Sequence, residues 1–198
     1  IMSLAYEEKV FLLADTLDEG ILGLTFTALA FKKLRTVPIL ITYPKNASVI
    51  VSILKNLGLN VSNTFSEENV YLRIVPLASE NTESKILKII AKLGIHNTLY
   101  LGVEETRETL LYMFKEILKE STNLLTILKS DKCVIRENIV MHPHPDIVFY
   151  VIFNSIFKNK SYTNKVFTKG IMAYEENFRG KQLKYLAYLK HLIISATK

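Results

Sequence analysis

Apolar residues along this chain alternate between short continuous runs and segments with a helical period. The runs are rich in Val, Ile and Leu, which is typical of strands covered on both faces. They predict strands at Val10–Leu13, Pro38–Tyr43, Val70–Leu77, Thr98–Leu101, Leu124–Leu128 and Asn138–Met141. The helical period predicts helices at Ile21–Leu34, Ala47–Leu57, Glu83–Leu93 and Glu105–Lys119. This alternation predicts an α/β fold, with a mostly parallel, doubly wound sheet of five to six strands.

The pattern changes after Pro145. A strongly apolar helix is predicted from Asp146, followed by a polar break at Lys158–Thr163. A long basic helix, or a pair of helices interrupted near Gly180, is then predicted for Tyr174–Ile194. We therefore divide the chain into an α/β domain, residues 2–157, and a basic helical C-terminal segment packed on it, residues 158–198.

Composition and charge narrow the class of protein. Of 198 residues, 49% are hydrophobic, which indicates a globular chain, and no apolar run has the length of about 18 residues that a membrane span needs. The single cysteine, Cys133, fits a reducing compartment and a buried or inert thiol. Residues 158–198 hold nine Lys and Arg but only Glu175 and Glu176 as acids, so the net charge of +6 is concentrated there. Such a basic surface attracts DNA phosphates or an acidic protein, or is simply a solvated helix face.

An acidic turn after the first strand carries the most chemical information. Asp15, Asp18 and Glu19 precede Gly20, at the carboxyl end of the strand, where α/β sheets place their sites. Carboxylates there hold Mg or Mn ions over a phosphate. Alternatively, Asp18 and Glu19 serve the N-terminus of the following helix, where anions are favoured.

This strand, turn and helix resemble the first motif of the DHH phosphoesterase superfamily, His-x-Asp-x-Asp-Gly. The resemblance continues through the strand that carries the second motif in the family and through the place of the third motif, which is Asp-His-His in the family. It ends at Ile139–Asp146, which resembles the family's "Asn-Pro-His" strand and helix. It covers about residues 9–157, with residues 37–69 as an added strand–helix unit or a shift in register. The motif positions here are Asp15, Leu17, Glu19, Gly20, Gly102, Lys129, Ser130, Asp131 and His144.

The resemblance implies a site that has lost its chemistry. The family uses two metal ions held by aspartates and a histidine, whereas Leu17 has no ligand atom and Lys129 brings a positive charge. We therefore expect no catalytic residues, no metal and no cofactor. The chain is most similar to degenerate RecJ-like proteins of archaeal and eukaryotic replisomes. That similarity implies a cytoplasmic, nucleoid-associated subunit that binds GINS and, through it, supports the MCM helicase.

Aromatic and basic residues interleave in the C-terminal segment, as single-strand binding or protein docking needs. The candidate partner or DNA surface consists of Lys160, Lys165, Lys169, Tyr174, Arg179, Lys181 and Lys184.

Two other functions stay open. An active Mn-dependent exonuclease or phosphodiesterase would bring together Asp15, Asp18, Glu19, Asp131 and His142. A nucleotide-binding sensor would use a crevice around Thr16, Ser79 and Gly102. A smaller metal site is also conceivable, because His142 and His144 would share one strand face with Asp146 next along it.

Overall fold

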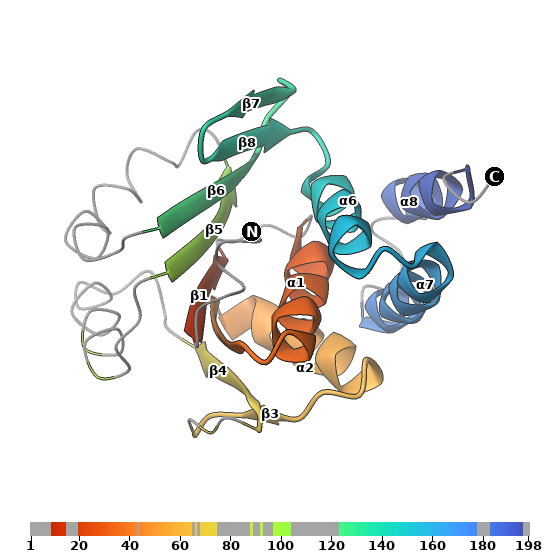
Figure 1. Cartoon of the computed structure of the whole chain (residues 1–198). Helices are drawn as coiled ribbons and strands as arrows, with labels where there is room; N and C mark the ends of the chain where they lie inside the picture. Colours follow the sequence, from red (N-terminus) through yellow and green to blue (C-terminus); the bar gives the residue numbers. More distant parts are fainter. Residues whose placement is uncertain are drawn as a thin grey trace.

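The computed structural model describes residues 9–14, 20–42, 44–64, 66, 68–74, 88, 92, 97–103, 123–177 and 183–195. Within them, eight strands form one sheet in the order β3-β4-β2-β1-β5-β6-β8-β7 (Figure 1). All neighbouring strands are parallel except β7 and β8, which pair antiparallel at one edge. The strands are β1 (Lys9–Ala14), β2 (Val37–Thr42), β3 (Val61–Ser62), β4 (Val70–Ile74), β5 (Asn97–Val103), β6 (Asn123–Lys129), β7 (Val134–Arg136) and β8 (Ile139–His142).

The α/β class is confirmed, with corrections to the strand count and the helix bounds. The six predicted strands all occur in the sheet, and the short strands β3 and β7 at its two edges raise the number to eight. Residues 37–69 do contain a strand–helix unit, and β2 lies between β1 and β4. The helices predicted at 83–93 and 105–119 fall almost entirely outside the described residues.

The described helices lie on one side of the sheet in Figure 1. They are α1 (Ile21–Lys33), α2 (Pro44–Asn56), α6 (Pro145–Phe157), α7 (Lys160–Asn177) and α8 (Leu183–Ser195). The C-terminal segment is thus a pair of helices, but the first begins at Lys160 rather than Tyr174. The polar break is correspondingly short, residues 158–159.

Helix α1 lies at the centre of the core. All of its residues from Ile21 to Phe31 are buried, because α1 packs against the sheet and also contacts α2, α6 and α7. A helix that is apolar on all sides is expected in such a position. The Phe26 ring of α1 and the Phe167 ring of α7 have centroids 3.7 Å apart, so α7 shares this core.

Glycines allow two of these helices to approach α1 closely. A Cβ built on Gly23 of α1 would overlap the Phe149 side chain of α6. A Cβ on Gly170 of α7 would lie 2.5 Å from the tip of the Phe26 ring. Both contacts are far shorter than packed carbon atoms tolerate, so the spacing of the helix layers depends on these two residues.

Candidate functional site

The order of the strands reverses between β1 and β5. The chain leaves β1 for β2 and β4 on one side, then returns to β5 on the other side of β1. In open parallel sheets, ligands bind at the carboxyl ends of strands where the order reverses in this way. Here β1 ends at Ala14, which pairs with Leu101 of β5.

The sheet register brings several of the DHH motif positions to this same edge. Gly102 follows the partner of Ala14 and pairs with Leu128. Lys129, the last residue of β6, pairs with Val103 on one side and His142 on the other. Asp15, Leu17 and Glu19 lie outside the described residues, as do Asp18, Thr16 and Ser79.

Ser130 and Asp131, two further motif positions, follow directly after β6. Ser130 is buried, and its Oγ accepts a hydrogen bond from the Lys132 N–H at 3.1 Å. Asp131 is exposed to solvent.

The Thr42 hydroxyl, at the carboxyl end of β2, is buried and has no hydrogen-bond partner among the described residues. This threonine is a polar group at the same edge that the sequence patterns did not single out.

The idea that His142, His144 and Asp146 share one strand face is wrong. Strand β8 ends at His142, and His144 is the N-cap residue of α6. The His144 N–H donates a hydrogen bond to Nδ1 of His142 at 2.9 Å, so the two residues form a turn and do not lie side by side along a strand. Their ring centroids are 6.2 Å apart, and no group of three metal-binding side chains occurs in the part of the chain that the structure describes.

Asp146 has a different role, which the sequence did not reveal. Its side chain is 1% exposed, and its two carboxylate oxygens accept hydrogen bonds from the N–H groups of Gly20 at 3.0 Å and Gly23 at 2.6 Å. Gly20 adopts the left-handed conformation, with φ of 97°, and provides no side-chain cap. Asp146 also lies in the first turn of α6. One buried carboxylate therefore serves the positive N-terminal ends of two helices.

One residue of the proposed C-terminal surface, Tyr174, does not lie at the surface. Lys160, Lys165 and Lys169 are exposed on α7. Tyr174 is 1% exposed and belongs to the core, because α7 starts earlier than predicted and its buried stripe includes Phe167, Ile171 and Tyr174. Arg179 and Lys181 lie outside the described residues, and so does the side chain of Lys184.

No family model, no curated protein and no solved structure matches this chain. The DHH resemblance therefore depends on the motif order in the sequence alone.

Among the described helices, none combines the length and apolarity of a membrane span. Cys133 is exposed, so of the expected buried or inert thiol the buried alternative is wrong.

Proposed function

We propose that this chain is a catalytically inactive RecJ-like member of the DHH superfamily, a subunit of the DNA replication machinery. In this role it binds GINS and supports the MCM helicase without hydrolysing DNA. The proposal includes the DHH-like, doubly wound arrangement of the sheet.

The observation that carries the proposal is the identity of the residues at the carboxyl edge of the sheet. Gly102 and Lys129 occupy positions where the family pattern has metal-binding side chains. Glycine has no ligand atom, and a lysine ammonium near the site opposes a divalent cation. Leu17, by its place in the sequence, removes one further carboxylate.

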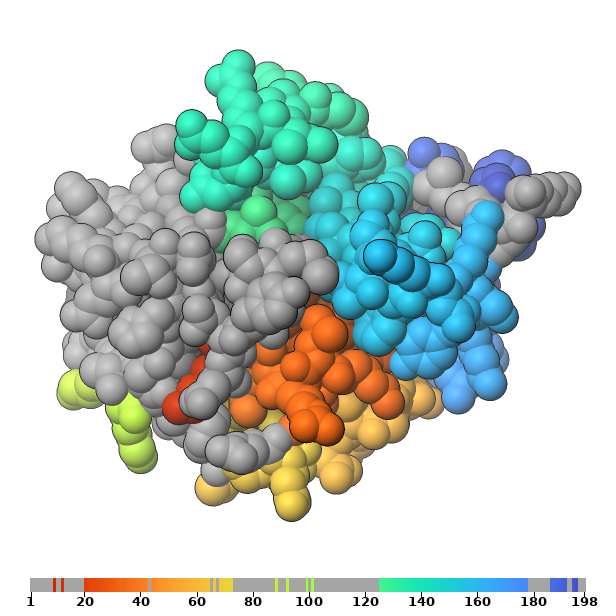
Figure 2. Space-filling view, in the orientation of Figure 1, coloured from red at the N-terminus to blue at the C-terminus, as the bar shows by residue number. Residues whose placement is uncertain are grey.

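Exposed apolar and basic side chains on the last two helices support a docking role. Lys160 and Met172 of α7 are exposed, Met172 by 56%, and Ile194 of α8 is exposed by 59%. Figure 2 shows α6 and α7, in cyan and blue, on the outer surface beside α1. Protein interfaces commonly combine methionine and other apolar anchors with a charged rim that sets orientation.

A pull-down with purified GINS tests this docking role. We expect wild-type protein to retain GINS and the double variant Lys160→Glu, Met172→Glu to retain much less. The single variant Lys45→Glu, which changes an exposed residue of α2, is the control and should bind as wild type does. Circular dichroism establishes that each variant is folded. Failure of folded wild-type protein to retain GINS would refute the docking role.

Incubation with labelled single-stranded DNA and Mn separates this proposal from the exonuclease. We expect no cleavage by wild type or by the Asp15→Ala, Glu19→Ala variant. Cleavage by wild type that the double variant lacks would establish an enzyme instead, since a contaminating nuclease would act equally in both preparations.

A further inference from the structure

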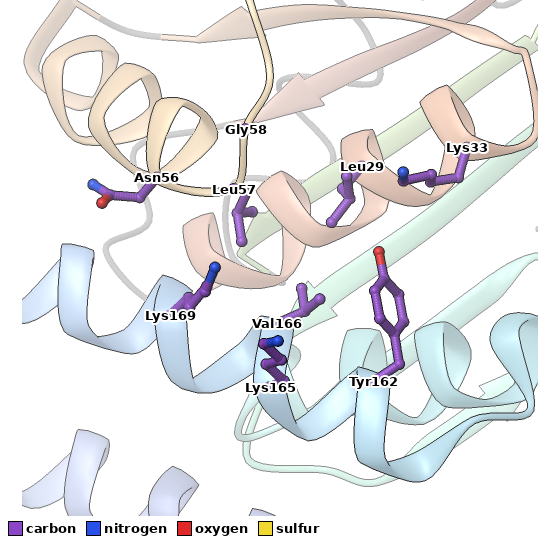
Figure 3. A pocket seen from close by; sticks show the side chains of 9 residues that line it. All are labelled: Leu29, Lys33, Asn56, Leu57, Gly58, Tyr162, Lys165, Val166 and Lys169. Carbon is purple, nitrogen blue, oxygen red and sulfur yellow. The ribbon is translucent and has the colours of Figure 1, made fainter.

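A concave site lies away from the carboxyl edge of the sheet. It is a pocket of about 320 Å³ between the C-terminal ends of α1 and α2 and the part of α7 from Tyr162 to Lys169 (Figure 3). Helix α1 has thirteen residues, so its C-terminal end, beside the pocket, lies roughly 20 Å from Gly20. Its lining consists of Leu29, Lys33, Asn56, Leu57, Gly58, Tyr162, Lys165, Val166 and Lys169.

Three lysines around this pocket have no counter-charge in the part of the chain that the structure describes. Within the described ranges, the ammonium groups of Lys33, Lys165 and Lys169 form no ion pair and no hydrogen bond. Helices α1, α2 and α7 together contain seven lysines and only two acids, Glu175 and Glu176, near the far end of α7. Glu175 is already paired with Lys190 of α8 at 2.6 Å. Positive charges gathered at one hollow repel one another, so an anion bound between them is favoured.

The helix dipole explains only part of this cluster. Lys33 lies in the last turn of α1, where a cation complements the helix carbonyls. Lys165 and Lys169 are one turn apart near the middle of α7, and neither lies in its last turn. Figure 3 shows both rising from α7 toward α1 and α2, while Lys33 comes from the opposite side.

The rest of the pocket is apolar and holds an aromatic ring. Leu29, Leu57 and Val166 contribute aliphatic side chains. The Tyr162 ring is fixed from behind by Phe157 and Phe153, at centroid distances of 5.4 and 6.4 Å. Its hydroxyl points toward α1 in Figure 3 and has no hydrogen-bond partner among the described residues.

We propose that this pocket binds a nucleotide. The phosphate lies between the three lysines, which bind phosphate as point charges, and the base lies against Tyr162 and the aliphatic wall. The volume is near the lower end of ligand pockets, about 300 to 1,000 Å³, and suits one nucleotide rather than a folded segment of a partner. The nucleotide is either free or the phosphorylated end of a DNA strand. The proposal does not depend on GINS binding, because it concerns the isolated chain.

Equilibrium dialysis of the isolated protein at physiological salt tests the proposal. The probes are radiolabelled AMP, adenosine and inorganic phosphate, and short oligo(dA) with and without a 5′-phosphate. We expect AMP to bind more tightly than adenosine or phosphate. Equal binding of both oligonucleotides, more tightly than AMP, would show that a strand backbone is held instead and would overturn the single-nucleotide site. Preference for the phosphorylated oligonucleotide over AMP identifies a strand end as the natural ligand.

Matched variants locate the binding. The double variant Lys165→Gln, Lys169→Gln should weaken AMP binding about tenfold or more, because each substitution removes a charged hydrogen bond to the phosphate. The double variant Lys45→Gln, Lys160→Gln removes the same charge from exposed positions outside the pocket and should change affinity less than about twofold. Tyr162→Phe keeps the ring and should retain most binding, whereas Tyr162→Ala should not.

Three further results would overturn the nucleotide site. They are equal affinities for AMP and adenosine, equal losses in the two lysine double variants, and absence of AMP binding by folded wild-type protein. If the pocket double variant is unfolded, Lys33→Gln replaces it, since that exposed lysine approaches the pocket from another helix.

Discussion

The carboxylate of Asp146 accepts a hydrogen bond from the backbone N–H of Gly23 at 2.6 Å, across 123 residues of sequence. Its other carboxylate oxygen accepts a hydrogen bond from the N–H of Gly20, so the start of α6 is hydrogen-bonded to the start of α1. Gly20 follows the acidic residues Asp18 and Glu19 in the sequence, and Asp146 follows β8. The contact therefore joins the central strand of the sheet to its far half at the edge where the candidate site lies.

Replacing Asp146 should destabilise the fold without greatly changing its shape. Asp146→Asn keeps the size but turns an amide NH₂ toward one of two N–H donors, leaving that donor unpaired. We expect a loss of about 1–3 kcal/mol in the free energy of unfolding, measured by urea titration, and a larger loss for Asp146→Ala. Glu176→Gln, an exposed change on α7, is the control and should be near neutral. Equal stability of Asp146→Ala and wild type would contradict the capping role.

Gly23→Ala should destabilise the protein even though alanine is the better helix former. The added Cβ would overlap the Cβ and the ring of Phe149, so no rotation of that side chain provides room. Helices α1 and α6 must move apart, at a cost of about 2 kcal/mol or more, which exceeds the gain of about 1 kcal/mol in helix propensity. Thermal unfolding followed by circular dichroism measures the difference. A higher midpoint than wild type would show that the close approach is absent.

Gly170→Ala should behave differently, because its new Cβ would meet only the tip of the Phe26 ring and a methyl group of Leu22. Phe26→Leu removes that ring tip. We therefore expect a double-mutant cycle of Gly170→Ala with Phe26→Leu to show favourable coupling, with the double variant more stable than the sum of the single losses. The cycle of Gly23→Ala with Phe149→Leu is the matched comparison and should show little coupling, since Leu retains the Cβ. Coupling of equal size in both cycles would refute this distinction.

Stability should fall at alkaline pH in a way that depends on Tyr150. Desolvation by burial raises the pKa of its phenol above the ordinary value of 10.0, and its hydroxyl donates to Oδ1 of Asn164 at 2.8 Å. The unfolded tyrosine ionises first as pH rises, so the stabilisation is complete below about pH 10 and is lost through the higher folded pKa. We expect the urea midpoint of wild type to fall more steeply than that of Tyr150→Phe as the pH rises above about 10. Parallel curves for the two proteins would argue against the shift.

Nδ1 of His142 lies within hydrogen-bond distance of two backbone groups of His144. The His144 N–H donates to Nδ1 at 2.9 Å, and the His144 carbonyl oxygen, which only a protonated Nδ1 could donate to, lies 3.0 Å away. We expect long-range ¹H–¹⁵N spectra of the neutral form to show an unprotonated Nδ1. Replacement of His144 by proline, which has no N–H, should remove this preference. A protonated Nδ1 in neutral wild-type His142 would mean that the ring accepts no such bond.

Local patterns in the sequence were sufficient for most strands and helices but not for the start of α7. The runs at 10–13 and 124–128 each form strands, because a continuous apolar run can be satisfied only by burial on both faces. Helix α7 begins at Lys160 because its polar first turn is exposed while Thr163, Val166 and Phe167 face the core. That buried stripe is narrow and interrupted by lysines, so the helical period of the apolar residues is weak there and the sequence places Tyr174 on the surface.

The sequence by itself determined the α/β class, most of the strand and helix positions, and the residues that stand in the degenerate motif. Burial along a strand or helix leaves a periodic record in neighbouring residues, and that record is local. Only the tertiary structure decided which helix ends Asp146 serves, which side of α7 is buried, and which three lysines surround one pocket. The contact between Asp146 and Gly20 joins residues 126 positions apart, and such relationships arise from strand order and helix packing, which no local period records.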